Sequence, residues 1–212
     1  MLYNGHLIIN DGRRQAIADK YPLDMTYKEY ITWNEEERCE VLDGKIISMA
    51  PSPIPEHQDI SMQLSIEIGT YLRGKTCKTF AAPIDVYLFQ DSNKKWIDEN
   101  VRNWLIPDLI VVCDPNKIKQ NKILGAPDFV VEIISPSSAK IDRLDKRLAY
   151  QRAGVKEYWI IDPANQIIEV YLLKGQTLEL NNVYNRGDFV SVQVLESLTI
   201  DTTILFPERT GN

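Results

Sequence analysis

The sequence predicts an α+β fold with an α/β core, in which a mixed central sheet is flanked by helices. Three observations lead to this prediction: two segments with helical apolar spacing, three strand-like apolar runs between them, and several alternating strands toward the C-terminus. The 212 residues suffice for one domain with its own hydrophobic core. We therefore expect a single domain that covers residues 1–212, with an N-terminal hairpin and a strand-rich C-terminal extension.

We divide this domain into three parts. Residues 1–25 form a polar leader, residues 26–173 form the core, and residues 174–212 form the extension. Thr26 and Glu29 have the spacing of a capping box, which predicts a short helix at the start of the core.

A hairpin is predicted directly after this short helix. Residues 38–49 alternate between apolar and polar side chains around Asp43-Gly44, a dipeptide typical of two-residue hairpin turns.

Two longer segments have the periodicity of amphipathic helices. Residues 56–72 carry an apolar side chain at every fourth position, and Gly74 follows as a helix end. Residues 138–153 form the second predicted helix, and Gly154 marks its end. The apolar stripe of this second helix consists of Ile141, Leu144 and Leu148.

Apolar runs predict the strands. Three of them lie between the helices, at residues 83–89, 104–113 and 128–134, and residues 90–103 form a polar loop between the first two. Further strands are expected after the second helix, at residues 157–163, 167–173, 177–180 and 189–195.

Charge and cysteine content narrow the class of protein. A net charge of −6 argues against a protein that coats DNA by neutralising its phosphates, although it still allows a local basic groove. Cys39, Cys77 and Cys113 are odd in number, far apart and not in C-x-x-C spacing, so we expect reduced thiols and neither disulfides nor a zinc site. The sequence has no run of about 20 apolar residues and no export signal at its start. We therefore expect a cytoplasmic protein that does not enter a membrane.

Glu132 is the residue that most clearly indicates a functional site. It lies in the middle of the apolar run 128–134, where an unpaired charge costs several kcal/mol. Asp108 opens the apolar end of the preceding run in the same way, directly after Pro107. Because consecutive strands are usually neighbours in a sheet, the two carboxylates are expected to converge.

Two converging carboxylates favour a divalent cation between them, and oxygen ligands favour Mg²⁺ or Mn²⁺ over zinc. The alternative for Asp108 is an ordinary turn carboxylate, and the alternative for Glu132 is a solvent-exposed position at a sheet edge.

Lys146 is expected beside Glu132. The strand advances about 13 Å from Glu132 to Pro136, and a helix from Ser138 returns about 12 Å by Lys146. On that helix, Asp142, Lys146 and Tyr150 recur every four residues and form a polar face. The alternative for Lys146 is a surface ion pair with Asp142.

The segments "IPDLIVV" and "PDFVVEIISPSSAKIDRLDKRLAYQRAGVKEYWIIDP" resemble the Uma family of restriction-endonuclease-like proteins, within the PD-(D/E)XK nuclease superfamily. The resemblance covers residues 26–173. It implies a restriction-endonuclease-like fold and a nuclease that uses Mg²⁺ or Mn²⁺ and acts on nucleic acid, with DNA as the first candidate. Separately, the exposed strand edges expected in the C-terminal extension favour a homodimer.

Site residues follow from the same resemblance. Asp108 and Glu132 match the two metal-binding acids of the superfamily motif. The lysine usually found two residues after the second acid is replaced here by Ile134, and Lys146 matches the place of a lysine supplied by the following helix. Glu40 and His57 lie in the segment that resembles the start of the family's domain, although a lone histidine at a helix start is more often structural. Asp85 is a candidate third acid because it lies in the middle of the run 83–89. The remaining supporting residues are Ser135, Asp142 and Tyr150.

Two observations bear on the nature of the substrate. Basic residues crowd the second helix and the loop of residues 117–122, which modestly favours a polyanionic substrate. The acidic net charge instead favours a non-catalytic DNA-binding or assembly module on the same fold. A two-carboxylate glycosidase is the most distant alternative.

Overall fold

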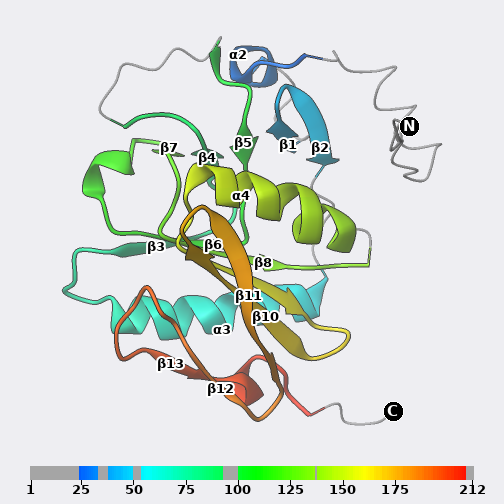
Figure 1. The fold of residues 1–212 in the computed structure, drawn as a ribbon, viewed down its shortest axis with the longest axis vertical. Helices are drawn as coiled ribbons and strands as arrows, with labels where there is room; N and C mark the ends of the chain where they lie inside the picture. The colour runs from blue at the N-terminus through cyan, green and yellow to red at the C-terminus, as the bar shows by residue number, and fades with distance from the viewer. Residues whose placement is uncertain (1–23, 33–37, 50–53, 93–99, 137, 209–212) are drawn as a thin grey trace.

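The computed structural model describes residues 24–32, 38–49, 54–92, 100–136 and 138–208. Its centre is a six-stranded sheet in the order β11-β10-β9-β8-β6-β3 (Figure 1). β8 and β9 are parallel, and the other neighbours are antiparallel. These strands are β3 (Lys78–Ala81), β6 (Leu109–Val112), β8 (Phe129–Ile133), β9 (Glu157–Asp162), β10 (Ile167–Lys174) and β11 (Thr177–Asn185). The mixed sheet with flanking helices confirms the predicted α+β class.

A second, five-stranded sheet has the order β2-β1-β5-β4-β7. Its strands are β1 (Cys39–Leu42), β2 (Lys45–Met49), β4 (Asp85–Tyr87), β5 (Trp104–Leu105) and β7 (Lys122–Leu124). β1 and β2 form the predicted hairpin, and both Asp43 and Gly44 have positive φ, at 50° and 77°, as its turn requires. The capping box of Thr26 and Glu29 is also present and begins α2 (Tyr27–Tyr30).

One face of the six-stranded sheet is covered by α3 (Pro55–Tyr71) and by the strand pair β12 (Phe189–Ser191) and β13 (Thr199–Asp201), as Figure 1 shows. Ile60, Leu64 and Ile68 of α3 are buried against Phe129, Val131 and Trp159, among other residues of the sheet. The predicted four-residue spacing of this helix is therefore its core-facing stripe. Two short 3₁₀ helices complete the elements on the periphery, η2 (Pro115–Lys117) and η4 (Thr202–Ile204).

The opposite face of the sheet packs against the five-stranded sheet and against a helix in two parts. A π-helical turn, η3 (Ile141–Lys146), runs directly into α4 (Arg147–Ala153). Gly154 ends the helix in the left-handed region with φ of 86°, as its position in the sequence predicted. Ala149 and Tyr150 pack in the core that this face shares with the five-stranded sheet.

The prediction of an apolar core-facing stripe on this second helix was wrong. Leu144 and Leu148 are 45% and 48% exposed, whereas Asp142, Lys146 and Tyr150 on the other side are buried. The helix presents its polar residues to the sheet because the partners of those residues lie there.

Two strand predictions also needed correction. The run 104–113 is divided around Pro107 between β5 of one sheet and β6 of the other, because proline cannot donate a ladder hydrogen bond. The run 83–89 contributes β4 to the five-stranded sheet, and not the first strand of the central sheet. The first strand of the central sheet is β3 instead. It is an edge strand whose residues are partly exposed and do not form an apolar run.

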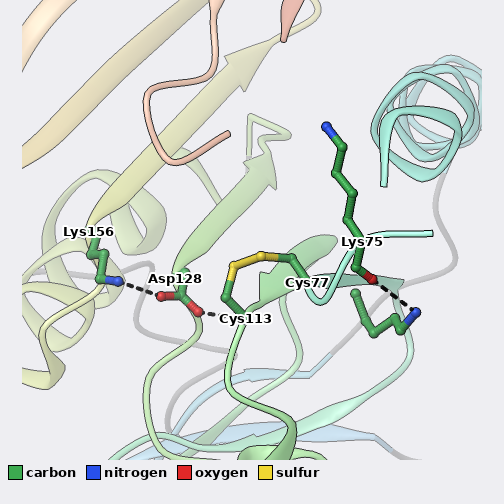
Figure 2. Close-up of a disulfide and its surroundings, with 6 residues drawn as sticks. Lys75, Cys77, Cys113, Asp128 and Lys156 are labelled. Atoms are coloured by element: carbon green, nitrogen blue, oxygen red, sulfur yellow. Dashed lines mark hydrogen bonds and ion pairs between the residues drawn. A yellow bond between two sulfur atoms is a disulfide. The ribbon is translucent and has the colours of Figure 1, made fainter. Parts of the chain in front are cut away.

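The expectation of reduced thiols was wrong for two of the three cysteines. Cys77 and Cys113 form a disulfide next to the paired residues Lys78 and Val112 of β3 and β6 (Figure 2). Asp128 anchors the same end of β6, since its carboxylate accepts a hydrogen bond from the Cys113 N–H and pairs with Lys156. Cys39 is buried and lies outside the disulfide.

Among the described helices, none is long and apolar enough to cross a membrane. Trp104 and Trp159 are fully buried. Trp33, Trp96 and all but the last two residues of the predicted leader lie outside the described residues.

Candidate active site

Glu132 lies in the middle of β8 and is only 3% exposed. Strand alternation places it on the same face as Val130 and Ile134, which pack in the core beneath α4 and the five-stranded sheet. A carboxylate in such surroundings needs charged or hydrogen-bonding partners. The structure supplies them from neighbouring elements.

Asp108 lies opposite Glu132 on the neighbouring strand. It is one step beyond the paired residues Leu109 and Val131 of β6 and β8. Its Oδ2 accepts a hydrogen bond of 2.7 Å from the N–H of Ile133, and its side chain is 18% exposed. The structure thus brings the two predicted acids to adjacent positions, one buried and one in contact with solvent.

Lys146, at the end of the π turn, is surrounded by three carboxylates. Its Nζ lies 2.8 Å from Glu40 Oε2, 3.0 Å from Glu132 Oε1 and 3.4 Å from Asp142 Oδ1. We call Glu40, Glu132, Asp142 and Lys146 the buried charge cluster, because none is more than 5% exposed. With all groups ionised, the cluster has two negative charges in excess.

The electrostatics of this cluster follow from burial. Burial raises the pKa of Glu132 well above its ordinary value; the charge of Lys146 lowers this pKa, and the charges of Asp142, Glu40 and Asp108 raise it. Burial alone would lower the pKa of Lys146, but its three carboxylate neighbours raise that pKa well above normal. Lys146 therefore stays positively charged.

Tyr150 fixes one oxygen of Glu132. Its hydroxyl donates a hydrogen bond of 2.6 Å to Glu132 Oε1, the same oxygen that contacts Lys146. Burial raises the pKa of Tyr150 well above normal, so the phenol keeps the proton that it donates. No described residue donates a hydrogen bond to the other oxygen of Glu132, Oε2.

Glu40 joins the cluster from the five-stranded sheet. It belongs to β1, and its Oε1 accepts a hydrogen bond of 2.9 Å from the N–H of Ile106. Because Ile106 is only two residues before Asp108, Glu40 connects the buried charge cluster to the segment that carries the second acid.

His57, in the first turn of α3, contacts Asp108. Its Nε2 is 3.2 Å from Asp108 Oδ1, and its Nδ1 is buried without a hydrogen-bond partner among the described residues. Burial lowers the pKa of His57, but the hydrogen bond and charge of Asp108, together with the main chain of Ile133, raise it by more. His57 is therefore a neighbour of Asp108 in the structure.

Asp85 does not join this group. In β4, Val86 faces the core beside the cluster, whereas Asp85 and Tyr87 face the opposite side of the five-stranded sheet. There the Tyr27 hydroxyl donates a hydrogen bond to Asp85 Oδ2. A third carboxylate near Lys146 comes from Glu40 instead.

Ser135 lies at the entrance of the helix that carries Lys146. Its N–H donates a hydrogen bond of 3.0 Å to the hydroxyl of Ser138, and its carbonyl accepts one from the N–H of Ala139. These contacts begin the helix directly after β8.

The predicted basic surface is largely occupied by internal contacts. Arg143 pairs with Asp162 and Glu169, and Lys156 pairs with Asp128. The other members of the two basic runs with a described partner are Lys117, Lys122, Lys146, Arg147 and Arg152. Most of these cations are therefore already neutralised or bonded within the protein.

The carboxylate oxygens at this site are the type of donor atom that a hard divalent cation such as Mg²⁺ prefers. Within the described residues, no group of three or more His, Cys, Asp and Glu side chains is arranged to hold a metal ion. Mg²⁺, however, is commonly held by only one or two carboxylates, with water and substrate oxygens as its remaining ligands. Asp108 and Glu132 are two carboxylates at adjacent positions, beside a cluster with excess negative charge.

Sequence reasoning missed one residue that contacts this assembly, Tyr158 of β9. Its hydroxyl donates a hydrogen bond of 3.0 Å to the main-chain carbonyl of Asp142. In the run "EYWIID" it looks like an ordinary core aromatic, and no local pattern distinguishes it.

Comparison with known proteins assigns the family. The model of the Uma2 family, described as "Putative restriction endonuclease", matches residues 26–203. The chain belongs to the Uma2 family. The match confirms the resemblance that the sequence motifs indicated, and it includes β11 to β13 in addition to the predicted core.

Two relatives illustrate how far the similarity to this Uma2 protein extends. The uncharacterised protein slr1290 of Synechocystis sp. is 29% identical over 147 residues, which are 68% of this chain and 72% of that protein. A crystal structure from Anabaena variabilis, described as a "putative nuclease belonging to DUF820", superposes with a TM-score of 0.67 at 21% identity. It covers 86% of this chain and 97% of the other, and at that identity it supports the fold alone.

Proposed function

We propose that this Uma2 protein is a metal-dependent nuclease that hydrolyses phosphodiester bonds of nucleic acid, with DNA as its first candidate substrate. One observation carries the proposal: the buried carboxylate of Glu132 lies opposite Asp108 and 3.0 Å from the Lys146 ammonium. Burying these charges is costly, and a core without a function would avoid that cost with apolar side chains.

Asp108, Glu132 and the carbonyl of Ile133 would hold Mg²⁺ or Mn²⁺. A bound divalent metal supplies positive charge that polarises a phosphoryl oxygen and lowers the pKa of a water molecule. Tyr150 fixes Glu132 Oε1 and leaves Oε2 available, and His57 orients Asp108.

Lys146 would act as a fixed positive charge. Because its pKa is raised well above normal, it does not accept a proton at neutral pH. Its ammonium group would instead orient the attacking water or stabilise negative charge that develops on the phosphate.

The test is cleavage of supercoiled plasmid and single-stranded DNA and RNA with Mg²⁺ or Mn²⁺. Glu132→Gln and Lys146→Ala should abolish cleavage, and a chelator should do the same to the wild type. The matched controls are Glu157→Gln, which alters another buried glutamate on the adjacent strand, and Lys156→Ala, which removes an exposed lysine. Cleavage that survives both site substitutions, or that persists in chelator, would remove the assignment.

A non-catalytic DNA-binding or assembly module is the second candidate function. The internal pairing of most basic side chains and the net charge of −6 weaken the attraction of a polyanion, which counts against an efficient nuclease and leaves room for a weakly binding or assembly module. This alternative predicts DNA retention in a mobility-shift assay that is the same with Glu132→Gln and with chelator, and no cleavage.

We also propose that the protein forms a homodimer. β11 is an edge strand of the central sheet, and it exposes Leu180 and Val183, at 52% and 40%. The main chain of Leu178 is bonded to Arg147 and Gln151, and the exposed part of this edge beyond Leu178 is suited to pairing with a second copy. Light scattering should give twice the mass of 24.4 kDa, and Leu180→Lys should yield monomers.

A further inference from the structure

The π turn between Ser138 and α4 determines which side chains face Glu132. In this turn the N–H of Arg147 donates to the carbonyl of Asp142, five residues earlier, and also to that of Leu144, instead of to the carbonyl four residues earlier. A four-residue step overshoots a full turn of an α-helix by about 40°, whereas in the wider π turn it falls short of one. The two deviations offset each other, so Asp142, Lys146 and Tyr150 lie along one line toward the sheet.

Tyr158 contacts the main chain at the centre of this turn. Its hydroxyl donates a hydrogen bond of 3.0 Å to the carbonyl of Asp142, the same carbonyl that accepts from Arg147. In a regular α-helix that carbonyl would accept from the N–H of Lys146. A side chain that inserts into the hydrogen-bond ladder is a known cause of such local departures from α-helical geometry.

The position of the Tyr158 hydroxyl is itself well defined. Tyr158 lies on β9 opposite Val130 of β8, so it faces the same side of the sheet as Glu132. Its ring packs between those of Tyr150 and Tyr171, with centroids 5.0 and 6.1 Å away. Burial raises the pKa of Tyr158 well above normal, so its hydroxyl keeps the donated proton.

The outer side of the turn is held separately. Arg143 donates a hydrogen bond of 2.9 Å to Glu169 and one of 3.2 Å to Asp162. The turn is therefore fixed on its solvent side by Arg143 and on its sheet side by Tyr158.

We propose that Tyr158 is a positioning residue: by holding the carbonyl of Asp142 it maintains the π turn and so keeps Lys146 against Glu132. Without its hydroxyl, the segment is free to return to α-helical hydrogen bonding, which rotates Asp142 and Lys146 relative to Tyr150. The inference rests on the proposed nuclease function only for the catalytic role of Lys146.

The test uses Tyr158→Phe, which removes the hydroxyl and keeps the ring packing. Tyr71→Phe is the matched control, because the Tyr71 hydroxyl also donates to a main-chain carbonyl, that of Glu196, at the far end of α3. Three measurements on both variants are amide hydrogen exchange at Arg147, the crystallographic distance from Lys146 Nζ to Glu132 Oε1, and the kinetics of DNA cleavage.

For Tyr158→Phe we expect exchange at Arg147 to accelerate by up to about tenfold, because the turn is no longer held in one conformation and this amide opens as it changes between the carbonyls of Asp142 and Arg143. We also expect the Lys146–Glu132 contact to lengthen and kcat to fall about tenfold to a hundredfold with KM unchanged. Tyr71→Phe should change none of the three, although both variants should lower the melting temperature slightly.

Wild-type exchange at Arg147 together with an intact Lys146–Glu132 contact in Tyr158→Phe would overturn the inference. So would equal effects of the two variants, since these would indicate a purely structural role. If the wild type cleaves no nucleic acid, the proposed function fails, whereas exchange and crystallography still decide whether Tyr158 positions Lys146.

Discussion

Lys146 determines the charge balance of the candidate site. It is the ammonium that Glu40, Glu132 and Asp142 share, at distances between 2.8 and 3.4 Å. Buried ion pairs add little net stability, but removal of one partner is costly because the remaining charge has no compensation. The residue should therefore influence stability as well as catalysis.

We predict that Lys146→Met destabilises the protein by about 3–5 kcal/mol near pH 8. The loss should shrink toward pH 5, because the carboxyls left without an ammonium bind protons more readily in the folded variant than in the unfolded chain. Urea unfolding at both pH values measures the effect. Lys156→Met, at an exposed ion pair, is the control and should cost about 1 kcal/mol or less at either pH; an equally small cost for Lys146→Met would contradict the prediction.

Glu157 offers a pH-dependence test away from the site. It is fully buried in β9, and burial raises its pKa above the ordinary 4.5 in spite of its hydrogen bonds from the N–H of Val194 and the Trp159 indole. A raised pKa means that the folded state binds the proton more tightly than the unfolded state does. The stability from this group is therefore complete below pH 4.5 and is lost as the pH rises through the folded pKa.

Glu157→Gln removes this titration. The free energy of unfolding of the wild type minus that of Glu157→Gln should decrease as the pH rises above 4.5. Denaturant titrations at several pH values provide the measurement, and a difference that stays constant over the range would count against it.

At the residue scale, the sequence was most informative where a local pattern was broken. Glu132 could be recognised because its charge interrupts an apolar strand. The length of strand after Glu132 matches the length of helix before Lys146, and this match predicted that the two residues lie side by side. Asp85 sits in an equally apolar run, but the sequence does not tell which sheet that run joins or which face it uses. Tyr158 has an ordinary core pattern, so its polar contact depends on tertiary structure alone.

At the scale of elements, the helix after β8 reverses the usual relation between polarity and burial. Its leucines face solvent, and its charged residues face the core. Apolar periodicity predicted correctly that a helix forms and where it ends, but the orientation is set by the carboxylates of Glu40 and Glu132, which come from distant parts of the chain. Only the polar pattern of Asp142, Lys146 and Tyr150 indicated this orientation.

We predict that Leu148→Ala changes the free energy of unfolding by about 0.5 kcal/mol or less, as is usual for exposed positions. Leu64→Ala, at a fully buried position of α3, should cost about 2–5 kcal/mol. Parallel urea unfolding of the two variants makes the comparison. A large loss for Leu148→Ala would show that this surface is covered in solution.

Strand prediction was wrong in two places: a short strand without an apolar run was missed, and one continuous apolar run was taken for a single strand. β3 is an edge strand of four residues with half-exposed side chains, so its apolar signal is weak. The run 104–113 looked like one strand because its apolar residues are contiguous, yet the chain changes sheets around Pro107. An apolar run indicates that its residues are buried, but it does not indicate in which sheet. Because both sheets bury the residues of this run, the change of sheet leaves no signal in the sequence.

At the scale of the whole molecule, the disulfide joins the edge strand β3 to β6. Cys77 and Cys113 are 36 residues apart in the sequence, and the loop that they close includes both β4 and β5. The odd number and wide spacing of the cysteines gave no indication of this pair, because the pairing depends on the register of two strands.

Replacement of both cysteines by serine should lower the free energy of unfolding by about 4 kcal/mol, the chain-entropy value for a loop of this length. Reductant should destabilise the wild type by a similar amount and leave the double variant unchanged, as chemical denaturation can show. Equal stability of the oxidised wild type and the double variant would contradict this prediction.

The passage of the chain from one sheet to the other has a mechanical consequence. β5 ends at Leu105 and β6 begins at Leu109, so only three residues cross between the layers. The first of these residues is Ile106, whose N–H donates a hydrogen bond to Glu40, and the last is Asp108. The candidate site therefore lies where the chain passes from one sheet to the other, and a cation held by Asp108 and Glu132 would tie this crossing segment to β8.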